Sequence, residues 1–386
     1  MTSAPDALYP GSSNPYHALL AQAQTQRRLL SVHWEVTQRC NERCRHCYLT
    51  VLPPQRRPDD ELTTAEGLAL IDQMAAMGVL HLSLSGGEFF VRRDWHELAA
   101  AAHAHRFVLR IFTNGLAITP AKAAQLAALQ PYAVEISLYG ADAATHDAVT
   151  QTPGAFARTC RAFALLADHG VRTVLKTPLM TCNIEQFDAL RDLAAALGAH
   201  FRYDLTLTPR RNGDPTPLRY ALRYTDLVRH YRRTLTSAPG LPGAGCRLCN
   251  LGRNALAIAP NGDVHPCLEL PIVVGNVRAA PLRTIWETAP AWTSLLALDA
   301  DALPTCRACP LGALCGRCHG AARHETGDWR TPATAHCMRA LALRQASIDR
   351  AFITAEMLPL TAHLAALKQR LEAQDAGEYE PARLDQ

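Results

Sequence analysis

Between residues 32 and 207, short apolar runs alternate with longer stretches in which apolar residues recur at helical spacing. The longer stretches span 63–78, 119–130, 154–170 and 183–198, and several begin with Thr or Asn and end with Gly, as capped helices do. The short runs predict strands at 32–36, 79–85, 107–112, 133–138, 171–176 and 201–207. Alternating strands and helices predict an α/β fold, a partial (β/α)6 TIM-like barrel two repeats short of closure.

The pattern changes after residue 208, and we expect five segments. They are an N-terminal extension at 1–31, the barrel-like core at 32–207, a turn-rich connector at 208–245, a loop-rich cysteine domain at 246–337 and a C-terminal helical tail at 338–386. The connector contains a predicted helix near 224–236, and Pro359 should break the helical tail. No apolar run reaches the eighteen residues of a membrane span.

Composition narrows the class of protein. Hydrophobic residues make up 48% of the 386 residues, which indicates a globular chain, and a net charge of +4 is too small to indicate nucleic-acid binding. The first twenty residues lack the basic start and apolar stretch of a secretory signal, so we expect a cytoplasmic location. Cytosolic thiols stay reduced, so clustered cysteines usually bind metal or do chemistry. Eleven of the 13 cysteines are clustered, and we interpret Cys160 and Cys182 as ordinary apolar residues.

The first cluster is Cys40, Cys44 and Cys47, directly after the first predicted strand. Ligands bind at the carboxyl ends of parallel strands, so the three thiols should lie at that edge. With His46 or His33 they could bind zinc. They could instead hold three irons of a [4Fe–4S] cluster and leave the fourth iron open.

The spacing CX3CX2C followed by the aromatic Tyr48 resembles the radical S-adenosylmethionine enzymes. The resemblance implies that the open iron binds the amino and carboxylate groups of S-adenosyl-L-methionine. An electron from the cluster then cleaves this cofactor to a 5′-deoxyadenosyl radical, which removes hydrogen from the substrate.

Other stretches at strand ends resemble the same family and imply cofactor-binding residues. In "SGGE", Ser85–Glu88, the resemblance assigns Gly86, Gly87 and Glu88 to the ammonium of the methionine, although Phe89 stands where the family commonly has Pro. Thr113 and Asn114 of "TNG", Ser137 of "SLYG" and Lys176 resemble family positions that contact cofactor or ribose. Each of these, taken alone, also suits an ordinary strand-end turn.

The later cysteines resemble the SPASM domain, which holds two auxiliary [4Fe–4S] clusters. By this resemblance Cys246, Cys249, Cys267 and Cys318 hold one cluster, and Cys306, Cys309, Cys315 and Cys337 hold the other. The spacing between Cys315 and Cys318 is X2, whereas X3 is usual in the family. Two alternatives stay open: a zinc knuckle formed by the four cysteines from Cys306 to Cys318, and a single auxiliary cluster. The stretch "NGDVHPC" predicts a hairpin whose turn is Asn261-Gly262.

In total the resemblance implies three [4Fe–4S] clusters, S-adenosyl-L-methionine and oxidation or cross-linking of a side chain in a peptide or protein substrate. SPASM enzymes with two auxiliary clusters mature peptides and proteins, including cofactor peptides. We expect a reductant such as flavodoxin or ferredoxin. Because the 31 residues ahead of the core lack a βαβ pattern, the leader of a precursor peptide would bind either a separate peptide-recognition protein or the second domain of this chain. Neither nucleic acid nor a membrane is an expected partner.

Asp204 and Tyr203 on the last predicted strand are our candidates for catalytic residues. Strand alternation puts them on opposite faces, and Asp204 could point into the barrel as a base or pair with an arginine. Further candidates near the opening are Tyr139, Arg210, Arg211 and His319. The alternatives are a radical enzyme that acts on a small molecule, and a non-catalytic iron–sulfur or zinc protein.

Overall fold

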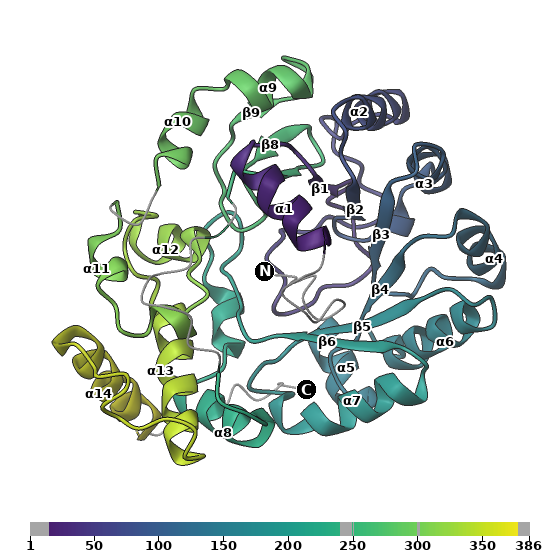
Figure 1. Cartoon of the computed structure of the whole chain (residues 1–386). Helices are drawn as coiled ribbons and strands as arrows, with labels where there is room; N and C mark the ends of the chain where they lie inside the picture. Colours follow the sequence, from purple (N-terminus) through teal and green to yellow (C-terminus); the bar gives the residue numbers. More distant parts are fainter. Residues whose placement is uncertain (1–14, 240–248, 250, 299–301, 377–386) are drawn as a thin grey trace.

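The computed structural model describes residues 15–239, 249, 251–298 and 302–376. Within these residues the central feature is a nine-stranded sheet with the order β6-β5-β4-β3-β2-β1-β7-β8-β9. The first six strands in sequence are neighbours and run parallel. They are β1 (Ser31–Glu35), β2 (His81–Ser85), β3 (Val108–Thr113), β4 (Ala133–Ser137), β5 (Thr173–Pro178) and β6 (His200–Asp204). The sheet curves without closing, as a partial barrel should (Figure 1).

Helices that connect these strands cover the outside of the sheet (Figure 1). They are α2 (Thr64–Ala76), α3 (Trp95–Ala104), α4 (Pro120–Leu129), α5 (Ala143–Thr150), α6 (Ala155–Ala167) and α7 (Phe187–Ala196). The helical stretches at 63–78, 119–130, 154–170 and 183–198 are confirmed; Thr63 caps α2 through a capping box with Glu66. Helix α3 was not among the predicted helices; Asp94, the residue before it, makes no cap hydrogen bond and instead accepts one from Arg92.

The segment after residue 250 continues the same sheet. Strand β7 (Ala255–Ile258) runs parallel to β1, and β8 (Asp263–His265) and β9 (Gly275–Asn276) follow as antiparallel neighbours. The predicted hairpin is present between β7 and β8, where Gly262 has a φ of +88° that favours glycine. The cysteine-rich segment therefore shares one sheet with the core.

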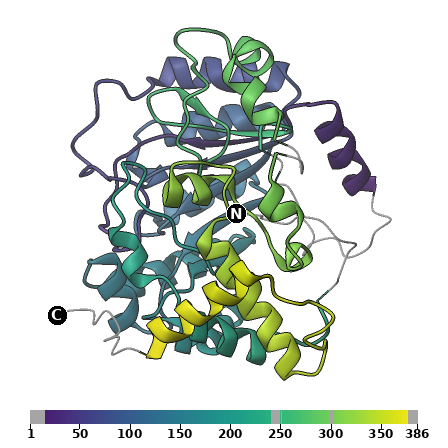
Figure 2. The same ribbon diagram turned by 90° about the vertical axis from the view of Figure 1, so that its left-hand side faces the viewer.

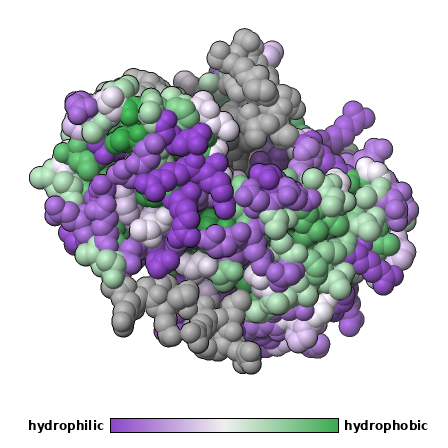
Figure 3. Space-filling view, turned by 90° about the horizontal axis from the view of Figure 1, so that it is seen from below, coloured by the Kyte–Doolittle hydropathy of each residue, from purple (hydrophilic) through white to green (hydrophobic). Residues whose placement is uncertain are grey.

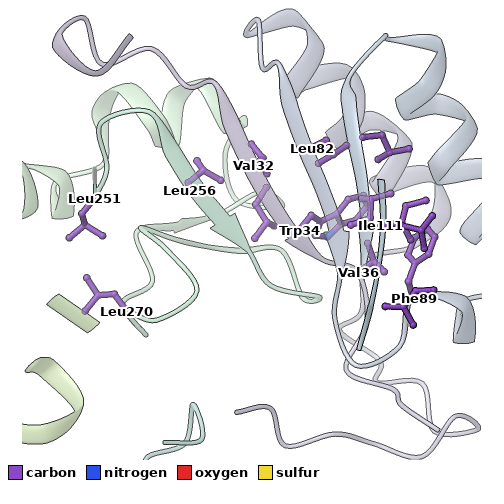
Figure 4. Packing of buried hydrophobic residues seen from close by; sticks show 14 of the residues in the cluster. Val32, Trp34, Val36, Leu82, Phe89, Ile111, Leu251, Leu256 and Leu270 are labelled. Carbon is purple, nitrogen blue, oxygen red and sulfur yellow. The ribbon is translucent and has the colours of Figure 1, made fainter. Parts of the chain in front are cut away.

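Among the described residues, one large hydrophobic cluster extends across this shared sheet, beside two small clusters. Trp34 of β1 is fully buried, and the cluster around it includes Leu82 of β2 and Leu256 of β7. Figure 4 shows these side chains together with Leu251 and Leu270, which extend the cluster into the cysteine-rich segment.

The other helices flank the opening of the sheet (Figures 1 and 2). They are α1 (Pro15–Thr25), α8 (Tyr224–Thr234), α9 (Leu282–Thr288), α10 (Ala291–Leu296), α11 (Pro304–Arg307), α12 (His319–Thr326), α13 (Thr334–Asp349) and α14 (Ala362–Ala376). The gap between α13 and α14 contains Pro359, the predicted break. No helix in the described ranges is long and apolar enough to cross a membrane.

Helix α8 packs on α13 and is tied to its neighbours by ion pairs at the surface. Arg232 of α8 pairs with Asp349 of α13 at 2.5 Å, and Arg233 pairs with Asp188 of α7 at 3.7 Å. Figure 3 views the molecule from below, and a hydrophilic band crosses the centre of that face. This face therefore lacks a continuous hydrophobic surface.

Candidate active site

A cavity of about 270 Å³ lies at the carboxyl ends of the parallel strands. One part of its lining comes from the loops after β1 to β6, and another part comes from the cysteine-rich segment through Leu268, Glu269, Cys318, Ala321 and His336. The cavity therefore lies between the barrel and the cysteine-rich segment.

The loop with the first three cysteines forms part of this lining. Cys40, Cys44 and Cys47 all border the cavity, although they lie within eight positions of one another along the chain. Burial raises the pKa of each thiol above its ordinary value, and nearby carboxylates, Glu42 among them, raise the pKa further. The loop therefore offers three close thiols that need a positively charged partner to become thiolates.

Glycines of the predicted "SGGE" turn pack against the start of this loop. Gly87 N donates to Thr37 O at 2.8 Å, and Glu88 N donates to Arg39 O at 2.8 Å. A Cβ atom on Gly87 would lie 2.3 Å from Arg39 O, and one on Gly86 would lie 2.3 Å from Thr37 O. Both glycines line the cavity, so the turn fixes the cysteine loop and leaves backbone exposed to a ligand.

The Glu88 carboxylate holds the "TNG" turn after β3. Its Oε1 accepts hydrogen bonds from Phe90 N and Thr113 Oγ1 at 3.0 and 2.7 Å, and its Oε2 accepts one from Asn114 N at 2.8 Å. Thr113 and Asn114 line the cavity, whereas Glu88 does not. Burial raises the pKa of Glu88, and the hydrogen bonds oppose this rise. In this geometry the carboxylate supports the lining without being part of it.

Tyr48, the aromatic residue after Cys47, belongs to a buried polar network. Its hydroxyl donates to Glu35 Oε1 at 2.6 Å, and Arg211 Nη1 lies 2.8 Å from Glu35 Oε2. Glu35 is 1% exposed, so this ion pair is shielded from water. Arg211 N also donates to Tyr48 O at 2.9 Å. Arg211, one of the further candidates from the sequence, therefore has a carboxylate partner within the protein.

Three of the strand-end residues that the family resemblance assigns to cofactor contacts also line the cavity. Ser85, Ser137 and Lys176 all border the cavity. Lys176 Nζ lies 3.7 Å from Glu135 Oε2 and 4.3 Å from the centre of the Phe112 ring. Burial lowers the pKa of Lys176 and Glu135 opposes this effect.

The two histidines considered as zinc ligands also border the cavity. His33 hydrogen-bonds Ser85, and burial with the nearby charges of Lys176 and Arg211 lowers the pKa of His33 to about 3. The His46 ring packs edge-on against Tyr139 with centroids 4.5 Å apart, and burial lowers its pKa to about 4. Both imidazoles are therefore neutral near pH 7.

The two catalytic candidates on β6 lie on different sides of the sheet. Asp204 lines the cavity, and its Oδ1 accepts a hydrogen bond from Thr206 N at 2.9 Å. Among the described residues no arginine pairs with Asp204 within 4 Å. Tyr203 lies away from the cavity, packs against Phe187 and His230 on α7 and α8, and is 39% exposed. Only Asp204 is placed to act on a molecule in the cavity.

Of the remaining candidates from the sequence, some line the cavity and others lie outside it. Tyr139 lines the cavity, whereas Arg210 pairs with Asp214 at 3.3 Å near the surface. His319 is 3% exposed and lies 2.6 Å from Arg317, outside the cavity lining. Its place is therefore in the cysteine-rich segment rather than at the opening.

The later thiols fall into two groups. The thiols of Cys249, Cys267 and Cys318 influence one another's pKa values. Cys306, Cys309, Cys315 and Cys337 form the second group: burial and the other thiols raise the pKa of Cys315 to about 11 and that of Cys337 to about 12. Cys246 lies outside the described residues. In these couplings Cys318 groups with Cys249 and Cys267, whereas a zinc knuckle would use all four cysteines of the run from Cys306 to Cys318.

The side chains in these groups are suitable ligands for iron–sulfur clusters. Among the described residues no three His, Cys, Asp or Glu side chains form a site for a single metal ion. The fit depends on the donor set, which comprises three, three and four cysteines. Their thiols are buried or partly buried and influence one another's pKa values within each set, and thiolates are the usual ligands of such clusters. Cys318 of the second set lines the same cavity as the first.

The sequence analysis did not identify two acidic residues of the cavity lining, Glu42 and Glu269. Glu42, between Cys40 and Cys44, is 2% exposed and its Oε1 has no hydrogen-bond partner within the described ranges. Burial raises its pKa to about 8, and hydrogen bonds from Cys44 and Asn114 oppose this rise. Glu269 also lines the cavity, and burial raises its pKa. The sequence does contain one indication of Glu42: it is an acidic residue between two of the clustered cysteines.

Comparison with protein families gives two matches. The radical SAM superfamily matches residues 34–194, and the SPASM family, an iron–sulfur cluster-binding domain, matches residues 249–310. The first match covers the barrel from the end of β1 into α7, with the three-cysteine loop but without β6, and the second covers β7 to β9 and α9 to α11.

Two curated relatives extend the comparison. The mycofactocin maturase MftC of Mycolicibacterium smegmatis is 34% identical over 274 residues, which cover 66% of this chain and 69% of the relative. The AdoMet-dependent heme synthase of Methanosarcina barkeri is 29% identical over 329 residues, which cover 77% of this chain and 93% of the relative.

Solved structures share the fold. SuiB of Streptococcus suis bound to its precursor peptide SuiA superposes with a TM-score of 0.63 at 18% identity, covering 84% of this chain and 81% of SuiB. The enzyme anSMEcpe with bound AdoMet and the Cp18Cys peptide gives 0.62 at 14% identity, covering 83% and 98%. At these identities the likeness concerns the fold.

Proposed function

The chain belongs to the radical S-adenosylmethionine superfamily and carries a SPASM domain, and from this we propose that it oxidises or cross-links a side chain of a peptide substrate. The observation that carries the proposal is the position of the cavity. Its lining contains Cys40, Cys44 and Cys47 on one segment and Cys318 on another. A substrate in this cavity lies between the site where a radical begins and a site that can accept an electron.

The residues that would hold the cofactors follow from the thiol groups. Cys40, Cys44 and Cys47 would hold the open [4Fe–4S] cluster, and the two later groups would hold the auxiliary clusters, with Cys246 completing one of them. When bound, the open cluster supplies the electron that cleaves S-adenosylmethionine to 5′-deoxyadenosyl radical and methionine. Gly86 and Gly87 offer backbone to the methionine end, and Thr113, Asn114, Ser137 and Lys176 line the remaining surface.

Oxidation of the substrate removes one hydrogen atom, one electron and one proton in this scheme. The 5′ carbon of the bound cofactor would take the hydrogen atom, and the auxiliary cluster that Cys318 would hold in part would take the electron. Asp204 is the proposed acceptor of the proton, because it faces the cavity and no arginine among the described residues neutralises it.

A peptide substrate is supported by the name of the 34% identical relative, a maturase of mycofactocin. The proposal includes a reductant such as flavodoxin or ferredoxin, a separate peptide-recognition protein and a cytoplasmic location, where thiols stay reduced before iron binds.

The first test is iron and sulfide content after anaerobic reconstitution of the wild type and of a variant with Cys40, Cys44 and Cys47 all replaced by Ala. We expect about twelve irons, and about eight in the variant. The variant should also lose formation of 5′-deoxyadenosine under dithionite. Equal iron in both proteins would contradict the assignment of the open cluster.

A second candidate function is radical chemistry on a small molecule. It is favoured by the match to the AdoMet-dependent heme synthase, which covers 93% of that relative. Incubation with candidate precursor peptides and, separately, with porphyrin precursors distinguishes the two. Substrate-dependent consumption of S-adenosylmethionine with a mass change in the peptide supports the first function, and a mass change in the porphyrin supports the second.

A further inference from the structure

Strand β6 forms one end of the sheet and is the least buried of the parallel strands (Figure 1). Each of the strands β1 to β5 has at least three buried residues, whereas none of the five residues of β6 is buried. Tyr203 is 39% exposed although its ring packs on Phe187 and His230. Within the part of the chain that the structure describes, the outer edge of β6 therefore has no neighbouring strand.

The backbone of this edge has free hydrogen-bonding groups. In a parallel pair, the N–H and C=O groups of alternate residues point to the neighbouring strand, and those of the residues between them point away. Leu179 N donates to Asp204 O at 2.8 Å, so Asp204 and Arg202 face β5. The backbone groups of Phe201 and Tyr203 then point away from β5, and no residue of the described ranges hydrogen-bonds them. Each of these two positions therefore offers one donor and one acceptor to another backbone.

The charged side chains of β6 leave this edge uncovered. Arg202 pairs with Glu135 of β4 at 3.5 Å, and Asp204 lines the cavity, so both lie over the inner face of the sheet. Proteins often protect an edge strand with proline, and the sequence HFRYD of β6 contains none. The edge is therefore available for pairing.

The same edge leads into the cavity. Asp204, the last residue of β6, and residues 206–208 just beyond it all line the cavity. Helix α13 lies beside this entrance, where Arg339 Nη1 donates to Thr206 Oγ1 at 2.6 Å. The Nε atom of Arg339 is buried and has no hydrogen-bond partner among the described residues. A polypeptide that follows the edge past Asp204 would therefore meet a free donor at the entrance.

We propose that the peptide substrate binds in an extended conformation as an added strand on the outer edge of β6, and that its continuation past Asp204 carries the target side chain into the cavity. This inference rests on the proposed function, because it assigns a binding mode to the peptide of that function. A peptide fits this edge better than a second copy of the chain, because a folded partner could not continue into the cavity. Strand addition supplies affinity through main-chain hydrogen bonds, so residues beside the target are held by their backbone.

Hydrogen exchange tests whether the edge is free and whether a peptide covers it. Reconstituted protein is studied anaerobically, alone and with the candidate precursor peptides that test the proposed function. Without peptide we expect fast exchange at the amides of Phe201 and Tyr203 and slow exchange at Arg202, which faces β5. A peptide that is modified should slow exchange at Phe201 and Tyr203. Slow exchange at both amides in the free protein would mean that the edge is already paired, and the proposal would be wrong.

Backbone N-methylation of the modified peptide tests the strand geometry. One N-methyl group is placed at successive residues beside the target. Only alternate residues of an added strand point their N–H groups to β6, so we expect KM to rise about tenfold at alternate positions and to change little between them. Equal effects at neighbouring positions would contradict an added strand.

A substitution on β6 tests the same contact from the side of the protein. Tyr203→Pro removes an edge N–H but no bond to β5, and strands tolerate proline at such a position. Tyr203→Val keeps the N–H and is the matched control. At equal iron content we expect KM for the peptide to be about tenfold higher in Tyr203→Pro than in Tyr203→Val. Equal KM values in the two folded variants would count against the added strand.

The outcomes separate this inference from the proposed function. If a peptide is modified but neither its N-methylation nor its effect on exchange shows pairing with β6, the peptide function stands and the added strand is wrong. If dithionite-reduced protein cleaves S-adenosylmethionine but modifies no candidate peptide, the peptide function fails, and the added strand fails with it.

Discussion

Arg317 donates a hydrogen bond from Nε to the Sγ atom of Cys306 at 3.3 Å. The guanidinium is 4% exposed and its Nη2 donates to Trp329 O and Thr331 O at 2.7 and 2.8 Å, so the charge is fixed beside the thiol. A hydrogen bond and a positive charge at a cluster sulfur stabilise the reduced, more negative state of the cluster.

We therefore expect Arg317→Gln to shift the reduction potential of one auxiliary cluster to a more negative value. The measurement is a redox titration followed by electron paramagnetic resonance. Arg330→Gln, at an exposed position nearby, is the control and should leave all potentials unchanged. If Arg317→Gln has full iron content and the wild-type reduction potential, Arg317 does not influence the potential of the cluster.

The buried pair of Arg211 and Glu35 should contribute more to stability than the neighbouring pair of Arg210 and Asp214. Arg211→Gln leaves Glu35, 1% exposed, without its cation, and loss of one partner of a buried pair costs about 3 kcal/mol or more. In a chain of this size that corresponds to a fall in Tm of roughly 4 °C. Arg210→Gln breaks a pair whose side chains are about one third exposed, and its effect should be below about 1 kcal/mol. Anaerobic thermal unfolding compares the two; equal Tm values would contradict the prediction.

Gly87→Ala should reduce the iron of the open cluster. The added Cβ would lie 2.3 Å from Arg39 O, so the cysteine loop has to move. We expect a loss of about four irons, with the auxiliary iron retained. Gly170→Ala is the control, because Gly170 has a φ of +66° but no atom within 4 Å of the added Cβ. It should lower stability slightly and keep all iron.

Acid should destabilise the fold partly through His230. Burial and the nearby Arg233 lower the pKa of His230 to about 4, and both ring nitrogens have no partner in the described part of the chain. Between pH 6.5 and 4 the unfolded chain binds the proton and the folded chain does not, so stability rises with pH in this window. The cost on going from pH 7 to pH 5 is about 2 kcal/mol for this one group.

His230→Phe keeps an aromatic ring against Phe187 and removes the titrating group. The loss of Tm between pH 7 and pH 5 should therefore be smaller than in the wild type. His103→Phe, at an exposed position on α3, should keep the wild-type pH dependence. Parallel pH dependence in wild type and His230→Phe would show that His230 does not contribute.

The strand pattern and the cysteine spacings were sufficient to predict the barrel and the location of the first three thiols. Both depend on local signals: alternation along a strand, and ligands close together in sequence. The same alternation correctly separates Asp204 from Tyr203, but it does not say which face is the cavity side. That depends on α7 and α8, whose Phe187 and His230 surround Tyr203.

Long-range features were not predictable in this way. The pairing of β7 with β1 joins residues more than two hundred positions apart, and a strand of four residues carries little sequence signal. The free oxygen of Glu42 depends on where Asn114 and Glu88 find partners, which only the packed turns determine.

The pairing of β7 with β1 also limits how the chain can be shortened. A polypeptide that ends at residue 207 would leave the backbone groups of β1 without the partners that Ala255–Ile258 now supply. An uncovered strand edge of this kind, with the buried Val32 and Trp34 beside it, is a template for aggregation. The barrel of this chain therefore needs its C-terminal segment to pair with the edge of its first strand. If that segment were exchanged for the one of a relative, the new segment would have to keep the strand that pairs with β1 as well as the cysteines.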